Sequence, residues 1–320
     1  MAPFGRQTHT RLVRLLLLCA IAVALLAGSS AARTPVVGSS AAFTFTTIDV
    51  PGANNTEARG INREGQIVGF YGRPEGSGAE GFLLDQGVFT TIDFPGAVDT
   101  LLTDITGRGK VLGFYTAAGT HRSALSRHPF TIMWPLFPRG DVTSHGFLLH
   151  HGVFMPFDVP GSMETVPLDF NGQREIVGGY VDTSSALHAF LLKDGTFSTI
   201  DVPGAADTQA SGINSGGQIV GTYDDGTIAH GFLRQPNGTF TTIDVPGALH
   251  TLATSINGHG QIVGFYYSPK AHGFLLDQGV FTTIDVPGAE VTFPWKIKGK
   301  RIVGGYQDFN GFTHGFLATP

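Results

Sequence analysis

The sequence predicts an all-β fold, a six-bladed β-propeller with four-stranded blades, closed by pairing of its N-terminal strand with its C-terminal strand. The first observation is a phrase of the type Ile-Asp-Val-Pro-Gly that recurs along the chain, with most copies 41 to 44 residues apart. Such a period is typical of a repeated supersecondary unit that buries its core against its neighbours. The six copies lie at 48–52, 92–96, 157–161, 200–204, 243–247 and 284–288.

The second observation is the content of each unit. The fifth contains four short runs rich in β-branched and aromatic residues, separated by Gly, Asn or Pro, and none has helical spacing. We therefore expect four strands per unit, joined by short loops. In this unit they cover 251–257, 261–266, 272–276 and 280–286.

The third observation concerns the two ends of the repeat array. It opens with a lone copy of the fourth strand, 43–50, and closes with a lone copy of the third strand, 314–317. If the two copies pair, the last unit gains its fourth strand from the N-terminus. This closure removes open sheet edges, whereas an open solenoid would leave both end strands unpaired. The predicted domain covers 43–320.

The last hairpin of each unit has a testable geometry. In four units the residue before Gly-Phe or Ala-Phe lies 13 positions before the repeated aspartate, so the hairpin centres on two residues ending in Gly. Glycine there favours a type I′ turn and places the first residue across from the aspartate. These loops are Gln86-Gly87, His151-Gly152, Asp194-Gly195 and Gln278-Gly279, and Pro236-Asn237-Gly238 makes the fourth unit's loop one residue longer.

The first 32 residues read as a secretory signal peptide. Arg6, Arg11 and Arg14 precede an apolar run, 15–27, and small residues lead to a cleavage site after Ala32. The run is short of the roughly 20 residues that span a bilayer. We expect a linker at 33–42, a secreted, extracellular or periplasmic protein, and no integral membrane span after cleavage. The alternative is an uncleaved N-terminal anchor.

Composition narrows the functional classes. Charged residues are 14% of the chain, glycine is abundant, and the formal net charge is −5. This suits buried strands joined by tight turns, and no basic face for a phosphate backbone is expected, so we predict no nucleic-acid partner. Cys19, the only cysteine, lies in the apolar run of the leader. Disulfides and cysteine-ligated zinc are therefore excluded from the cleaved chain.

The recurring phrases resemble the HAF-type extracellular repeats of bacteria. The resemblance rests on His188-Ala189-Phe190 and its His-Gly-Phe counterparts, on Gly-Gln-Ile-Val-Gly and on Ile-Asp-Val-Pro-Gly, in fixed order over about 43–320. It implies a secreted or surface-exposed repeat protein and brings no catalytic residues. Two departures are Glu80, in place of His in the first copy, and Lys298, in place of Asn in the last.

Histidine and aspartate recur once per unit, which favours a structural role. Each histidine can donate a hydrogen bond to the aspartate across its hairpin and stabilise the end of the strand. A single His–Asp pair lacks the further ligands that a metal needs, so we expect no metal site and no cofactor. The predicted pairs are His145–Asp158, His188–Asp201, His230–Asp244, His272–Asp285 and His314–Asp49.

Residues that break the repeat symmetry are the candidates for ligand binding. On the expected innermost strands, Arg59, Asp104, Asp169, Trp295 and Lys296 replace small, hydroxyl or apolar residues of other units. We expect them to form a polar and aromatic cluster at one mouth of the central channel, suited to a sugar or another small polar ligand. The alternative is solvated rim charges and a core tryptophan.

An insertion at about 120–143 also breaks the symmetry and stretches one interval to 65 residues. It contains Trp134 and lies between the middle strands of the second unit. A long loop on a rigid scaffold often carries binding. A decayed duplicate hairpin or a disordered excursion are the alternatives.

These observations predict a non-enzymatic, monomeric binding scaffold whose ligand, protein or glycan, is unknown. One alternative is a propeller hydrolase or lyase acting on glycans or esters, with Asp104 and Asp169 as its carboxylate pair. The chain has no Gly-x-Ser-x-Gly elbow, His-Glu-x-x-His motif or phosphate loop, which disfavours this alternative. The other alternative is a purely structural surface repeat protein.

Overall fold

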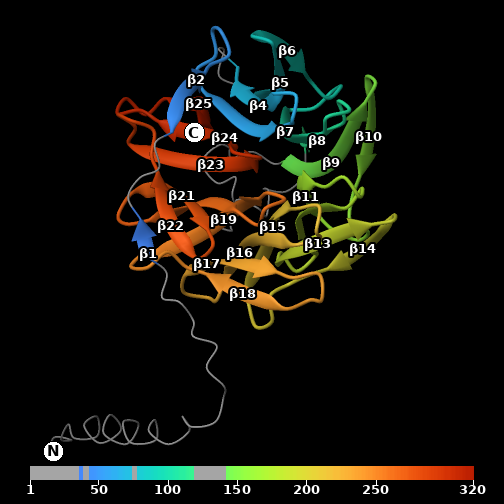
Figure 1. Cartoon of the computed structure of the whole chain (residues 1–320). Helices are drawn as coiled ribbons and strands as arrows, with labels where there is room; N and C mark the ends of the chain where they lie inside the picture. The colour runs from blue at the N-terminus through green and yellow to red at the C-terminus, as the bar shows by residue number, and fades with distance from the viewer. Residues whose placement is uncertain (1–35, 39–42, 74–77, 119–141) are drawn as a thin grey trace, which may run out of the picture. The chain divides into compact units, whose positions relative to one another are not determined.

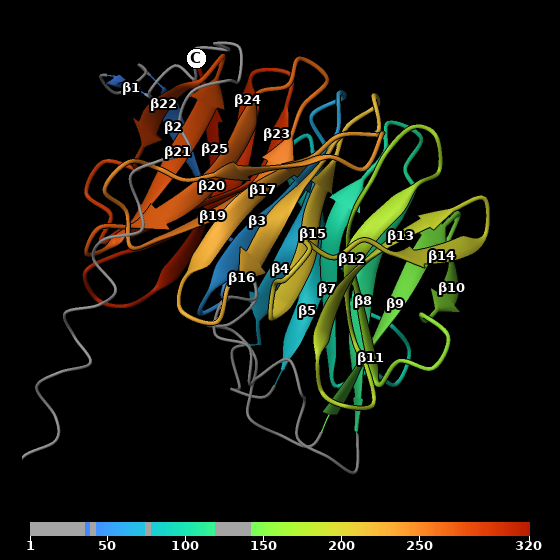
Figure 2. The same cartoon turned by 90° about the horizontal axis from the view of Figure 1, so that it is seen from below.

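A computed structural model describes residues 36–38, 43–73, 78–118 and 142–320, with side chains from residue 43. The predicted all-β, six-bladed fold is confirmed: six four-stranded antiparallel sheets follow one another around a ring (Figures 1 and 2). Among the residues described, none forms a helix with the length and hydrophobicity of a transmembrane segment.

The strands of each blade follow the chain from the innermost to the outermost, except in blade 6, whose outermost strand comes from the N-terminus. Blade 1 contains β3 (Thr56–Ile61), β4 (Ile67–Gly72), β5 (Ala79–Asp85) and β6 (Val88–Ile92). Blade 2 contains β7 (Asp99–Ile105), β8 (Val111–Ala118), β9 (Val142–His150) and β10 (Val153–Phe157). Blade 3 contains β11 (Glu164–Phe170), β12 (Ile176–Val181), β13 (Leu187–Lys193) and β14 (Thr196–Thr199). Blade 4 contains β15 (Asp207–Ile213), β16 (Ile219–Asp224), β17 (Ala229–Arg234) and β18 (Phe240–Ile243). Blade 5 contains β19 (His250–Ile256), β20 (Ile262–Tyr267), β21 (Ala271–Asp277) and β22 (Val280–Ile284). Blade 6 contains β23 (Val291–Lys298), β24 (Arg301–Gln307), β25 (Thr313–Thr319) and the N-terminal β2 (Thr44–Ile48).

Ring closure occurs as predicted. Strand β2 pairs antiparallel with β25, with Ile48 opposite Gly315, and the innermost strands β23 and β3 lie side by side. One feature was not predicted: β1 (Val36–Gly38), in the segment expected to be a linker, pairs parallel with β22 and gives blade 5 a fifth strand.

The Val-Pro-Gly phrase forms the connection from one blade to the next. In blade 5, Ala248 N donates to Val245 O at 3.0 Å, and Gly247 has a φ of 82°, a value that favours glycine. The hydroxyl of Thr251 then accepts a hydrogen bond from Val245 N at 3.0 Å. The same hydroxyl bond fixes all six connections, through Thr56, Thr100, Thr165, Thr208, Thr251 and Thr292.

The Gly-Phe phrase supplies the core of each blade. Phe274 is fully buried and packs over Gly264 of the neighbouring strand, where an added Cβ would lie 2.8 Å from the Phe274 ring. Glycine at this position therefore makes room for the ring. The equivalent side chains are all buried: Phe82, Phe147, Phe190, Phe232, Phe274 and Phe316.

The predicted hairpin turns are confirmed. Gln86 and Gly87 both have positive φ, 50° and 83°, as a type I′ turn requires, and Asp85 pairs with Val88 across the loop. The other three two-residue loops have the same signs of φ. Blade 4 has the longer loop, closed by the bond from Gln235 N to Thr239 O at 2.8 Å.

Antiparallel pairing gives each blade two distinct ends. The turn between the first and second strands and the hairpin between the third and fourth share one end, which we call the hairpin end. The loop between the second and third strands and the Pro-Gly connection share the other, the crossover end. In blade 1, the bond from Gln66 Nε2 to Asp85 Oδ2, 2.8 Å long, joins the two turns of the hairpin end.

Candidate functional site

The innermost strand of every blade contains a β-bulge at the same position. In blade 1 the register with β4 shifts between Ala58 and Gly60, which leaves Arg59 as the extra residue. A bulge re-aims the side chain of the extra residue. We call the six extra residues the bulge ring, which consists of Arg59, Thr103, Leu168, Ser211, Thr254 and Trp295.

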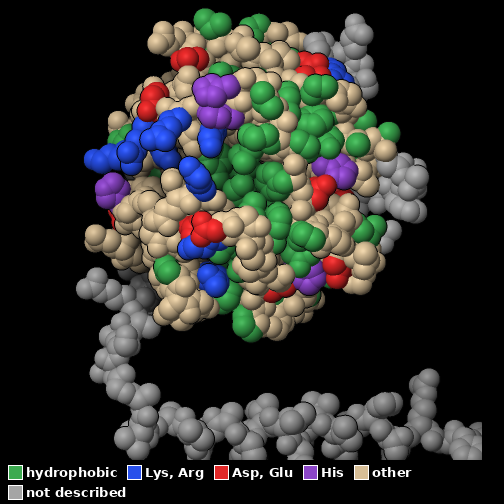
Figure 3. Space-filling view, turned by 90° about the vertical axis from the view of Figure 1, so that its right-hand side faces the viewer, with side chains coloured by type: hydrophobic (Ala, Val, Ile, Leu, Met, Phe, Trp, Pro, Cys, Tyr) green, Lys and Arg blue, Asp and Glu red, His purple; other side chains and the backbone are tan. Residues whose placement is uncertain are grey.

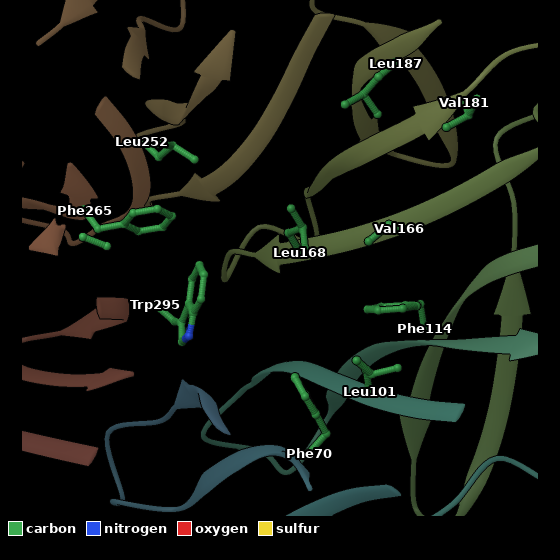
Figure 4. Packing of buried hydrophobic residues seen from close by; sticks show 11 residues of the cluster. Phe70, Leu101, Phe114, Val166, Leu168, Val181, Leu187, Leu252, Phe265 and Trp295 are labelled. Atoms are coloured by element: carbon green, nitrogen blue, oxygen red, sulfur yellow. The ribbon is translucent and has the colours of Figure 1, made fainter. Parts of the chain in front are cut away.

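Side chains of the bulge ring meet at the centre of the propeller. Trp295 of blade 6 and Leu168 of blade 3, on opposite sides of the ring, belong to one buried cluster with Phe70 and Phe265 (Figure 4). Trp295 packs edge to face against Phe265, with ring centroids 5.5 Å apart. The centre is therefore packed with aromatic and aliphatic side chains.

A buried ion pair lies against this cluster. The Arg59 guanidinium is 3.8 Å from the centroid of the Trp295 ring, and its Nη2 lies 2.8 Å from Glu57 Oε2. Burial raises the pKa of Glu57 and lowers the pKa of Arg59, and their mutual attraction opposes both shifts. An arginine stacked on tryptophan gains cation–π energy, most of all when desolvated.

The residue that follows each bulge forms a second, narrower ring. Lys296 of blade 6 donates to Asp104 Oδ2 of blade 2 at 2.8 Å and to Asp169 Oδ1 of blade 3. Asp169 also accepts from Ile213 N of blade 4 at 2.8 Å. At the equivalent Gly60, an added Cβ would lie 2.6 Å from the Asp104 Cα. This central triad of Lys296, Asp104 and Asp169 thus joins blades across the ring.

Burial governs the protonation of the central triad. It raises the pKa of Asp169 to about 7, because desolvation and the neighbouring Asp104 outweigh the attraction of Lys296. Burial alone would lower the pKa of Lys296, but the two carboxylates raise it. The ammonium is therefore charged at neutral pH, and the carboxyl of Asp169 holds its proton to a higher pH than an exposed aspartate does.

Four side chains of the bulge ring keep a buried nitrogen or oxygen without a hydrogen-bond partner among the described residues. These atoms are Arg59 Nε, Thr103 Oγ1, Ser211 Oγ and Trp295 Nε1, from four different blades. Each such atom costs about 1–3 kcal/mol if it stays unsatisfied. Thr254 differs, since its hydroxyl donates to Pro294 O at 2.8 Å.

The structure brings together five of the six predicted ligand-binding residues. Arg59 stacks on Trp295, and Lys296 bridges Asp104 and Asp169. The two aspartates are 2% and 1% exposed, so these charges are not solvated rim groups. The sixth residue, Trp134, and nearly all of the insertion lie outside the described residues.

Sequence reasoning missed Glu57, which lies two positions before Arg59. A signal was present, because a glutamate stands where other units carry apolar side chains or an amide. The equivalent residues, paired with the second strand in the same register, are Leu101, Val166, Gln209, Leu252 and Phe293.

The histidine–aspartate pairs lie in the predicted register at the crossover end. Their Nδ1–carboxylate distances range from 2.6 Å for His188–Asp201 to 3.0 Å for His230–Asp244. The other pairs measure 2.9 Å for His145–Asp158, 2.8 Å for His272–Asp285 and 3.0 Å for His314–Asp49. Over the described ranges, no group of three or more His, Cys, Asp or Glu is arranged to hold a metal ion.

No family model matches the chain, and no curated protein matches it. Among solved structures, it is similar to a protein of unknown function from Dyadobacter fermentans, with 13% identity, a TM-score of 0.52 and coverage of 86% of this chain and 96% of that one. It is also similar to regucalcin, a calcium-binding protein from Agrobacterium tumefaciens (12% identity, TM-score 0.51, coverage 88% and 94%). A third is the β-propeller domain of the Trilobed protease from Pyrococcus furiosus, described as having an open velcro topology. It has 11% identity and a TM-score of 0.50, and the match covers 82% of this chain and 79% of that one. Identities this low support the fold alone.

Proposed function

We propose that this protein is a secreted, non-enzymatic binding scaffold that holds a small polar ligand, such as a saccharide, at the bulge ring. The observation that carries the proposal is the set of buried polar atoms on Arg59, Thr103 and Ser211 that have no hydrogen-bond partner in the described ranges. A ligand with hydroxyl groups would satisfy them, beside the buried Trp295 ring that already carries the Arg59 guanidinium.

The central triad supports binding over acid–base catalysis. A glycosidase needs one carboxyl that protonates the leaving oxygen and another that attacks or activates water. Here Asp104 and Asp169 are buried and both contact the Lys296 ammonium. Both carboxylates are engaged by the same ammonium, which disfavours separate acid and base roles for them.

Secretion is supported by the sequence. The leader-like residues 1–32 and the absence of cysteine from the chain that follows fit an exported protein. The resemblance to HAF-type extracellular repeats points the same way.

The test is a saccharide array screened with the purified full chain, followed by calorimetric titration of any retained sugar. We expect Thr103→Val and Ser211→Ala to weaken binding by about 5- to 150-fold each, the equivalent of 1–3 kcal/mol. Neither should lower the melting temperature, because neither hydroxyl donates to or accepts from any residue that the structure describes.

Thr254→Val is the matched control within the bulge ring. Its hydroxyl is already bonded to Pro294 O, so the variant should lose stability and keep its affinity. An array that retains no saccharide, or affinity that survives both hydroxyl deletions, would reject the bulge ring as the ligand site.

A further inference from the structure

Charged side chains separate between the two ends of the propeller. Most described lysines and arginines lie at the hairpin end, in its turns or in the adjoining strand ends, whereas the crossover end carries the repeated aspartates and their histidines. In Figure 3 the lysines and arginines gather mainly on the left of the view, where some acidic groups and histidines also lie, and further acidic groups beside histidines lie toward the right. The formal net charge of −5 is a sum over the whole chain and therefore does not reveal this separation.

The basic residues nearest the axis follow one another around part of the ring. They lie in the turn after the innermost strand, or at the end of that strand in the case of Lys298, in blades 6, 1, 2 and 3, which are consecutive. The same turn in blades 4 and 5, Ser215–Gly217 and Gly258–Gly260, contains no lysine or arginine. We call the set the basic arc, formed by Lys298, Lys300, Arg63, Arg108, Lys110 and Arg174.

Hydrogen bonds join the turns of blades 6, 1 and 2 that carry the basic arc. Asn62 Nδ2 of blade 1 donates to Thr106 O of blade 2 at 3.1 Å. Arg301 Nη2 of blade 6 donates to Asn62 O at 3.0 Å and to Arg63 O at 2.7 Å. The backbone supporting these cations is therefore held in place before any partner binds, which lowers the entropic cost of association.

Four cations of the basic arc form no ion pair with the part of the chain that the structure describes, and one carboxylate, Glu64, lies in the same turn as Arg63. These four exposed cations are Arg63, Arg108, Arg174 and Lys300. By contrast, Lys193, in the outer hairpin of blade 3, lies 2.6 Å from Glu175. Exposed arginines without partners present their planar forks for bidentate contact with carboxylates.

We propose that the basic arc binds an acidic polysaccharide, whose carboxylates recur along the chain as the cations recur from blade to blade. A nucleic acid fits less well. Single strands bind by stacking on aromatic side chains, but the described exposed aromatics, Phe309 and Phe312, lie at the crossover end. The surface is distinct from the bulge ring, so either proposal can fail without the other.

The experiment uses the purified full chain and immobilised polygalacturonate, with dextran as the uncharged comparison, in biolayer interferometry. We expect binding to polygalacturonate that weakens steeply with salt, and none to dextran. The triple variant R63Q/R108Q/R174Q should lose at least about tenfold in affinity.

The matched control is K193Q/R234Q/K270Q, which removes the same charge outside the basic arc. It should retain the affinity of the native chain within about twofold. If the two triple variants lose the same affinity for polygalacturonate, binding depends on net charge alone and the proposal is overturned. Absence of polygalacturonate binding by the native chain, or tighter binding to a DNA duplex than to polygalacturonate, would overturn it as well. Matching thermal unfolding curves for both variants exclude misfolding as the cause of a loss.

Discussion

At the scale of single residues, the central triad shows how burial sets the properties of a charge. Lys296 lies between two carboxylates that would repel each other without it, and the pKa of Asp169 rises to about 7 mainly because the group is desolvated. An ionised carboxylate there is less favourable than in the unfolded chain. The fold therefore holds a proton that the unfolded chain has released.

This protonation makes stability depend on pH. The pKa of Asp169 is raised above its ordinary value of 3.8, so its stabilising contribution is complete below about pH 4 and is lost as the pH rises through 7. Asp169→Asn, which resembles the protonated acid, should lack this dependence. Urea unfolding at several pH values between 4 and 8 should show the native chain losing stability relative to the variant as pH rises. Parallel pH profiles for the two proteins would contradict the assignment.

The same scale shows where sequence reasoning stopped. Arg59, Asp104, Asp169, Trp295 and Lys296 could be proposed from their broken symmetry, because the repeat aligns equivalent positions. Their partnerships could not, since they depend on which blades face each other across the ring. Glu57 was detectable by the same comparison, applied two residues earlier.

At the scale of elements, the hairpins were predictable and the bulges were not. The spacing of each His–Asp pair about a Gly-containing loop determines strand register directly. A bulge leaves no trace in residue counts when every repeat contains it, as between Ala253 and Ser255. The bulge can be recognised only from the shift in register between the innermost strand and the neighbouring strand.

The histidine–aspartate pairs give a prediction at this scale. His272→Ala should lower the free energy of unfolding by about 0.5–1 kcal/mol, a modest loss because the pair is partly exposed. A double-mutant cycle with Asp285→Ala measures the coupling by urea unfolding. Additive effects of the two substitutions would show that the 2.8 Å bond contributes nothing to stability.

At the scale of the whole molecule, closure joins segments far apart in sequence. The pairing of β2 with β25 completes blade 6, and it was predictable because the two end copies are halves of one hairpin. The separation of charge between the two ends was not found from the sequence, since net charge averages over both. Knowledge of which turns share an end was needed first.

Closure should dominate global stability. Deleting 43–50 removes β2 and leaves β25 as an open edge, so we expect aggregation or loss of cooperative thermal unfolding, measured by circular dichroism and light scattering. Deleting 36–38 removes only the added strand β1 and should lower the melting temperature slightly. Similar behaviour of the two deletions would show that the N-terminal strand does not close the ring.

The link from Lys296 to the blade opposite makes the six repeats inequivalent despite their shared phrases. A circular permutation that starts the chain at another Pro-Gly connection would keep the order of the blades and therefore the contacts of Lys296 with Asp104 and Asp169. Replacing blade 3 by a duplicate of blade 5 would put a serine in place of Asp169, so that Lys296 would keep Asp104 as its one carboxylate partner in the triad. Duplication of one repeat can therefore have produced the six blades, but the charged residues of the central triad make each blade specific to its position in the ring.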